Sequence, residues 1–188
     1  LVRQNVIVRR ARPAESPDLL RECRDLAIAM RVRQRGPHPV KVADGWRNAG
    51  AMAGSIIVGT PIVEEFNVEA RKGVLAHEVG HIRGRHSAKQ SIALASAYGM
   101  LVLFLSSAQF PLIVDVLVLF SGMALSMSKV SWACEFDADA VAARYVGSGT
   151  MISALRALSG DDDESRRRDT WSHPSMARRI ARLQTLGG

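Results

Sequence analysis

The chain has 188 residues and a formal net charge of +7, and this length favours one domain with its own hydrophobic core over two domains. Its two cysteines, Cys23 and Cys134, lie far apart without CxxC spacing, which argues against a disulfide framework and against a cysteine zinc site. The charge could attract nucleic acid, but no aromatic residues alternate with the arginine clusters. We therefore expect solvated basic faces and no nucleic-acid partner.

The N-terminal third of the chain predicts one helix followed by short strands. Its first residue is Leu and no signal-peptide pattern follows, so we expect the numbering to begin inside a longer precursor. Ser16 and Pro17 have the character of an N-cap and a first helical residue, and apolar residues continue at helical spacing to Met30. Residues 38–60 are partly β-branched and punctuated by glycines, which predicts two or three short strands with a turn near Gly54.

Two helices are predicted next. Thr60 and the proline that follows it can start a short helix, and Asn67 can cap a longer one that runs to His86 and contains the stretch "LAHEVGHIRGRH". The residues that fall on one side of the longer helix at helical spacing are Ala70, Val74, His77, Glu78 and His81. The two histidines of an H-E-x-x-H motif therefore share a face with apolar residues.

This motif predicts a metal site. Residues i and i+4 are neighbours on a helix, so His77 and His81 can present two imidazoles to one zinc ion. Glu78 is displaced in angle from both histidines and can reach a metal-bound water instead of the metal. The pattern is typical of zinc peptidases, which need a third protein ligand as well.

The third histidine of the stretch is a poor candidate for that ligand. In the metzincin pattern the third histidine lies three residues beyond a glycine. Here Gly84 is in place, but three residues further on stands Ser87, and His86 comes one residue early. On a continuous helix His86 would lie about 180° around the axis from His77, so we expect a helix-end residue that does not bind the metal.

An apolar segment follows this helix. No charged residue occurs from Gln90 to Val114 or from Val116 to Ser128. The segment divides at "QFP" into residues 91–108 and 112–128, and each leg would reach roughly 26 Å, against about 30 Å for a bilayer core. We predict a helical hairpin over residues 91–128 that inserts into a membrane; a hairpin buried in a water-soluble protein is the alternative. Basic residues flank both legs on one side, as the positive-inside rule expects, namely Arg83, Arg85, Lys89 and Lys129.

The C-terminal third supplies the candidate third ligand. Residues 132–146 predict a helix that contains "CEFDADAVA", in which Glu135 and Asp139 are i and i+4. One of these carboxylates could bind zinc while the other accepts the free N–H of a ligating histidine; Asp137 points off that face. Residues 149–160 and 173–186 predict two further helices, and the polar segment 161–170 between them predicts a mobile loop.

Three stretches, "HEVGHIRGRH", "CEFDADAVA" and "WSHPSMARRIARL", occur in this order. They resemble the H-E-x-x-H-x-x-x-x-H, E-x-x-x-D-x-x-A and [ST]-H-P-x-x-x-x-R-I signatures of the HtpX-like and CAAX prenyl protease family of zinc metalloendopeptidases, and the resemblance runs from about Asn48 to the last helix. It implies an α+β, mainly helical fold: one gluzincin-type metalloprotease domain over residues 1–188, with a small sheet beside the H-E-x-x-H helix and an inserted apolar hairpin.

The resemblance also implies roles for single residues. It implies Zn²⁺ on His77, His81 and Glu135, with Glu78 as the catalytic carboxylate, which leaves Asp139 to accept a hydrogen bond from a ligating histidine. A strand near Asn48 and Ala49 would form the edge of the substrate cleft. His173, in the H-P motif, would stabilise the oxyanion or occupy the open position of zinc; the alternative is a histidine that only leads the loop into the last helix. Arg179 would help to hold the site.

We therefore predict a zinc-dependent metalloendopeptidase that hydrolyses protein or peptide substrates by zinc-activated water with a glutamate general base. At the level of the family, the expected role is quality control of membrane or misfolded proteins. We expect membrane association with the active site on the cytoplasmic side, and a soluble protein is the alternative. A zinc-binding but inactive interaction module is the alternative function, and the sequence does not indicate an oligomeric state.

Overall fold

The computed structural model describes residues 10–33, 39–52, 54–107, 112–160 and 163–187. These residues form a mainly helical structure around a small mixed sheet of four strands, as the α+β prediction requires. The strands are β1 (Arg12–Pro13), β2 (Val40–Ala43), β3 (Ala49–Met52) and β4 (Ser55–Gly59), in the spatial order β1-β2-β4-β3. Strands β2 and β4 are parallel, and the other two pairs are antiparallel. Strand β3 therefore lies at an edge of the sheet.

The first described helix, α2 (Pro17–Ala29), begins where the sequence predicts it. The Ser16 hydroxyl accepts a hydrogen bond from the backbone N–H of Leu19 at 3.4 Å, and Pro17 occupies the first turn. The apolar stripe of α2 is buried through Leu19, Cys23 and Leu26. The predicted turn near Gly54 joins β3 to β4, with Gly54 in the left-handed region at φ 85°.

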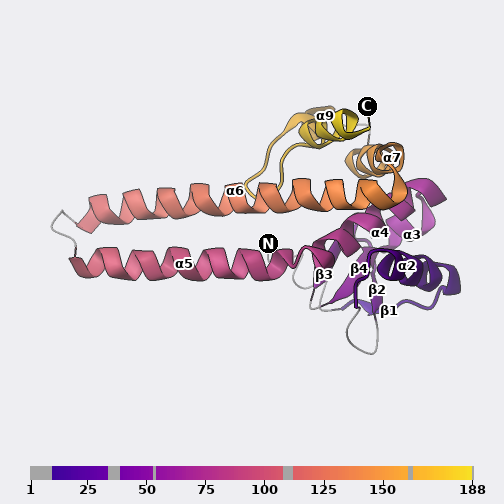
Figure 1. The fold of residues 1–188 in the computed structure, drawn as a ribbon, viewed down its shortest axis with the longest axis horizontal. Coiled ribbons are helices and arrows are strands. Elements are labelled where there is room, and N and C mark those ends of the chain that lie inside the picture. The colour runs from indigo at the N-terminus through magenta and orange to yellow at the C-terminus, as the bar shows by residue number, and fades with distance from the viewer. Residues whose placement is uncertain (1–9, 34–38, 53, 108–111, 161–162, 188) are drawn as a thin grey trace.

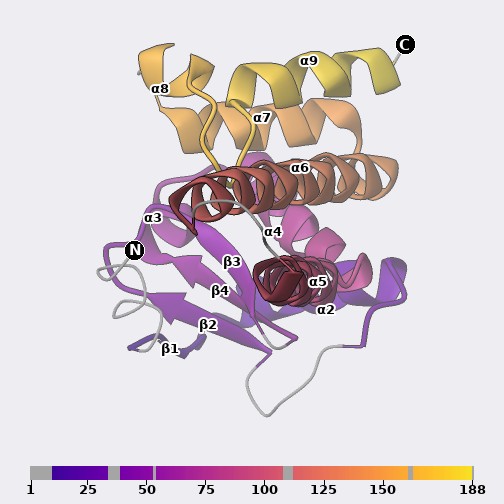
Figure 2. The same ribbon diagram turned by 90° about the vertical axis from the view of Figure 1, so that its left-hand side faces the viewer.

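Helix α4 (Val68–Arg83) follows the short helix α3 (Thr60–Glu64) and forms the centre of the fold. As predicted, the Asn67 side chain caps it by accepting a hydrogen bond from Ala70 N at 2.7 Å. In Figure 2 the sheet and α2 lie below α4, and α6, α7 and α9 lie above it. A Cβ on Gly80 would stand 2.9 Å from the carbonyl oxygen of Ala138, so glycine is needed for the close approach of α6.

The predicted continuous helix to His86 is wrong. Helix α4 ends at Arg83, Gly84 and Arg85 form a turn, and a new helix, α5 (His86–Ser107), begins at His86. Arg85 adopts the left-handed conformation with φ 51°, which redirects the chain between the two helices. His86 therefore begins α5 instead of ending α4, and only 1% of its surface is exposed.

Helix α5 and the first part of α6 (Leu112–Val146) run alongside each other and extend away from the sheet and α4 (Figure 1). Many apolar side chains along them are exposed, including Ile92, Tyr98, Met100, Leu103, Phe120 and Leu125. Within the described ranges, none of the helices combines the length and the apolar character needed to cross a membrane. The predicted "QFP" division point, residues 109–111, lies outside the described residues.

The remaining helices are α7 (Ser148–Ser159), α8 (Asp163–Arg167) and α9 (Met176–Leu186). The segment predicted as a polar mobile loop therefore contains a short helix, and residues 161–162 of that segment lie outside the description. Helix α9 buries Leu183 and Arg179, and the hydroxyl of Ser175 caps its first turn by accepting from Arg178 N at 3.4 Å. Through this packing α9 brings an arginine to the junction of α4 and α6.

Candidate metal centre

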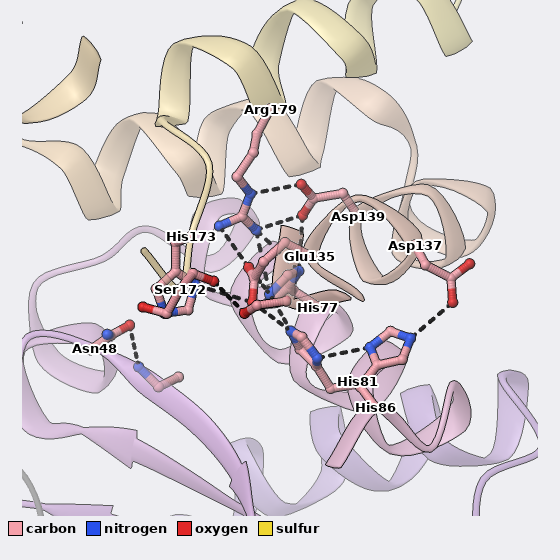
Figure 3. Close-up of polar contacts among 12 residues, drawn as sticks. Asn48, His77, His81, His86, Glu135, Asp137, Asp139, Ser172, His173 and Arg179 are labelled. Carbon is pink, nitrogen blue, oxygen red and sulfur yellow. Dashed lines mark hydrogen bonds and ion pairs between the residues drawn. The ribbon is translucent and has the colours of Figure 1, made fainter. Parts of the chain in front are cut away.

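Three potential metal ligands from two helices meet at one point (Figure 3). His77 and His81 lie one turn apart on α4, and Glu135 faces them from α6. The closest donor atoms of the three side chains all lie within 4.8 Å of one another. Nε2 of His77 is 3.5 Å from Oε2 of Glu135, and Nε2 of His81 is 3.4 Å from Oε1 of the same carboxylate.

These atoms fit a zinc ion. In a tetrahedral site with bonds of about 2.1 Å, neighbouring ligand atoms lie roughly 3.4 Å apart, close to the two imidazole–carboxylate distances. The Nε2 atoms of His77 and His81 are 2.9 Å apart. The Nδ1 atoms face other partners, Oδ1 of Asp139 at 2.9 Å and Nδ1 of His86 at 2.9 Å. When each ring carries its proton on Nδ1, the two Nε2 lone pairs converge, and a cation between them removes their repulsion.

The charges around the donors also favour a cation. Burial and Arg179 lower the pKa of His77, but hydrogen bonds to Asp139 and Glu135 outweigh them and raise it to about 10. Burial raises the pKa of Asp139, yet the charge and hydrogen bonds of Arg179 hold it at about 2. Burial also raises the pKa of Glu135, but hydrogen bonds from His173, His77 and His81 outweigh it and keep the pKa of this carboxyl well below its usual value. Two ionised carboxylates thus face the His77 ring.

A cleft of about 690 Å³ opens over the three donors. Glu78 lines it from α4, next to His77, and is only 7% exposed. Asn48 and Ala49 line another wall, at the beginning of edge strand β3. The cleft therefore joins the H-E-x-x-H helix to the strand that the sequence predicted as the cleft edge.

His173 reaches the donors from the segment between α8 and α9. Its Nδ1 lies 3.1 Å from Oε1 of Glu135, and just over half of its side chain is exposed. The segment is anchored on both sides of the imidazole. The hydroxyl of Thr170 donates to the His173 carbonyl and accepts from the His173 N–H, each at 3.0 Å. The hydroxyl of Ser131 on α6 donates to the carbonyl of Ser172 at 2.5 Å.

His86 does not join the donor group but touches it from outside. Its Nδ1 faces Nδ1 of His81, and its Nε2 lies 2.9 Å from Oδ2 of Asp137 on α6. Burial lowers the pKa of His86, partly offset by Asp137. That His86 does not bind the metal stays a prediction, and its basis, a continuous helix, was wrong.

A model of peptidase family M48 matches residues 13–186 of the chain. The chain belongs to peptidase family M48. The match spans nearly the whole sequence and includes all three motifs, so the resemblance to this group of metallopeptidases is confirmed. Comparison with the curated proteins gave no match.

A solved structure has the same fold as this M48 chain. The crystal structure of Ste24p from S. mikatae superimposes with a TM-score of 0.70 and 20% sequence identity. The match covers 93% of the present chain and 51% of the Ste24p chain, so the M48 chain spans about half the length of that protein. At this identity the likeness concerns the fold alone.

Sequence reasoning on this M48 chain missed the pairing of His86 with Asp137. Two signals in the sequence were present, the glycine two positions before the third histidine and the acidic residue two positions after Glu135. Neither says where the side chains point, because that depends on the backbone turn at Arg85 and on the distance between α4 and α6.

Proposed function

We propose that this chain is a single metalloprotease domain of a zinc-dependent endopeptidase. The observation that carries the proposal is the convergence of His77, His81 and Glu135 at one point, beside a buried Glu78 in a cleft, in a chain of peptidase family M48. His77, His81 and Glu135 would hold the zinc ion, and Asp139 would fix the ring of His77 by accepting its Nδ1 proton.

Glu78 would act as the general base and then as the general acid. When bound, zinc would supply Lewis acidity for the scissile carbonyl and for the attacking water. The Glu78 carboxylate lines the cleft next to the donors, where it would take a proton from that water and pass it to the departing amine nitrogen. Burial of Glu78 keeps this proton transfer away from bulk solvent.

His173 would stabilise the negative charge that develops on the carbonyl oxygen. Its imidazole lies on an anchored segment beside Glu135, which fixes it before substrate arrives. The second possibility is that it occupies the remaining position at the metal in the resting state. The two roles predict different effects of substitution and can be separated by kinetics.

Edge strand β3 would bind the substrate backbone in an extended conformation. The carbonyl of Asn48 accepts from the N–H of Gly59 at 2.9 Å. Because backbone groups alternate in direction along a strand, the N–H of Ala49 points to the free edge. There it is occupied by Oδ1 of the Asn48 side chain at 2.9 Å, an acceptor that a substrate carbonyl could replace.

We further propose that α5 and the first part of α6, within residues 91–128, associate with a membrane. Exposed apolar side chains along both helices support this proposal. Four exposed basic residues near the end of these helices closest to α4 support it as well, namely Arg83, Arg85, Lys89 and Lys129. The charges favour an active site on the cytoplasmic side. Substrates would then be membrane or misfolded proteins in quality control, and a soluble enzyme is the alternative.

The proposal is tested by measuring zinc content and casein cleavage on the same samples. Wild type should bind one zinc ion and cleave casein, and Glu78→Gln should keep the zinc and lose cleavage by at least about 10³-fold. Glu64→Gln, an exposed substitution of the same type on α3, serves as control. Unchanged cleavage by Glu78→Gln would overturn the proposal. Zinc binding without hydrolysis of any unfolded protein would favour the inactive interaction module.

A further inference from the structure

The outer nitrogen of His81 faces a second histidine instead of a carboxylate. Nδ1 of His81 lies 2.9 Å from Nδ1 of His86, and the two rings meet edge to face with centroids 4.9 Å apart. On its far side His86 contacts Asp137 at 2.9 Å. His77 differs, because its Nδ1 meets Asp139 directly. The two candidate ligands of α4 are thus supported by different partners.

The positions of the protons along this chain follow from the geometry. Binding of a metal through Nε2 of His81 requires that its single proton is on Nδ1. Nδ1 of His86 must then be an unprotonated acceptor, so the proton of His86 is on Nε2. Asp137 accepts that proton with Oδ2. In this series of hydrogen bonds, His81 donates to His86 and His86 donates to Asp137, whose carboxylate is the last acceptor.

The backbone is shaped to hold His86 in this place. Arg85 in the left-handed conformation turns the chain back, and a Cβ on Gly84 would collide with the imidazole of His86. His86 is almost completely buried, whereas half of the Asp137 side chain is exposed, with Lys89 Nζ 3.9 Å from its carboxylate. The ring is therefore fixed by packing, and its last partner can be altered with little effect on the core.

We propose that His86 and Asp137 are positioning residues that hold His81 in the tautomer and orientation that bind zinc. The inference rests on the proposed zinc site and does not require that the protein cleaves peptides. Outer partners of metal-binding histidines change metal affinity by about 10- to 100-fold when they are removed. The same range is expected for Asp137→Ala, His86→Leu and Gly84→Ala, the last because it displaces the ring without deleting it.

The test is a titration of the metal-free protein with zinc against a chelator of known affinity. The three variants should bind zinc about 10 to 100 times more weakly than wild type, and Asp137→Asn, which keeps an acceptor oxygen, should recover part of the loss. Asp25→Ala and Gly99→Ala are the matched controls, because Asp25 is exposed on α2 and a Cβ on Gly99 in α5 meets nothing within 4 Å. Melting curves of the metal-free proteins should show that Asp137→Ala remains folded.

A second measurement reports the proton positions themselves. Long-range ¹H–¹⁵N NMR spectra of the zinc-loaded wild type should show His81 protonated at Nδ1 and His86 protonated at Nε2 alone. A proton on Nδ1 of His86, or zinc affinities of the variants equal to those of the controls, would overturn the inference. Zinc binding by wild type without peptide cleavage would remove the proposed enzyme and leave this inference standing. A wild type that binds no zinc would remove both.

Discussion

Arg179 holds both carboxylate oxygens of Asp139. Its Nε and Nη2 donate to Oδ2 and Oδ1 at 2.7 Å each, and its Nη1 lies 3.1 Å from Oε2 of Glu135. All three side chains are buried. Helix α9 thus supplies a buried guanidinium that contacts both carboxylates beside His77, and it does so with the planar fork geometry that only arginine provides.

Replacing this arginine should destabilise the protein. Arg179→Lys keeps the positive charge but cannot reproduce the two parallel hydrogen bonds, and it leaves a buried carboxylate oxygen without a donor. We therefore expect a loss of about 1–3 kcal/mol in the free energy of unfolding. Urea denaturation of the metal-free protein measures it. Arg182→Lys on the same helix, where the exposed guanidinium lies 4.7 Å from the centroid of the Phe136 ring, is the control. Equal losses for both variants would contradict the prediction.

Glu135→Gln should weaken zinc binding by about a hundredfold or more, because Glu135 is the only one of the three proposed protein ligands that carries a negative charge and glutamine does not carry it. Competition with a chelator measures the affinity. Glu15→Gln, at an exposed position before α2, should bind zinc like wild type. Retention of full affinity by Glu135→Gln would show that another group supplies the third ligand.

Steady-state kinetics and zinc affinity together distinguish the two proposed roles of His173. If its imidazole stabilises the oxyanion, His173→Gln should lower kcat by about 10²–10³-fold with KM and zinc affinity close to wild type. If it instead occupies a position at the metal in the resting protein, the variant should bind zinc more weakly and kcat should not fall. An unchanged kcat together with an unchanged zinc affinity would exclude both roles.

The exposed apolar helices predict partition into a detergent phase. Wild type should enter the detergent-rich phase of a nonionic detergent above its cloud point, and the double variant Met100→Lys and Leu103→Lys should shift to the aqueous phase. Both side chains are 70% exposed on α5, so the variant should keep its fold, which the circular dichroism spectrum checks. Wild type that stays in the aqueous phase would favour the soluble alternative.

Cys23 predicts a loss of stability at alkaline pH. Burial and the neighbouring Glu22 raise the pKa of its thiol to about 12, above about 8.5 in an unfolded chain. The stability that the neutral thiol contributes is therefore complete below the pKa of Cys23 in the unfolded chain. It is lost as the pH rises towards the pKa of Cys23 in the folded protein. Between pH 8.5 and 10.5 wild type should lose about 2 kcal/mol more than Cys23→Ala in the free energy of unfolding. Parallel pH curves for the two proteins would contradict this.

The sequence by itself determined the local features of the protein. Ser16 and Asn67 fix the beginnings of α2 and α4 because a cap acts on backbone groups two or three residues away. His77 and His81 are neighbours on any helix, so their pairing needs no tertiary information. The three ordered motifs were sufficient for the family, which the match over residues 13–186 confirms.

Only the tertiary structure decided how these features meet. By spacing alone, Glu135 and Asp139 were equivalent candidates for the third ligand. The packing of α6 against Gly80 places Glu135 next to both His77 and His81. It places Asp139 next to His77 and Arg179. The direction of His86 depends on one left-handed residue, Arg85, which helical periodicity does not contain. The metal-binding role of these side chains stays a prediction, but their convergence follows from helix packing, because residues far apart in sequence are brought together by buried surfaces and not by local spacing.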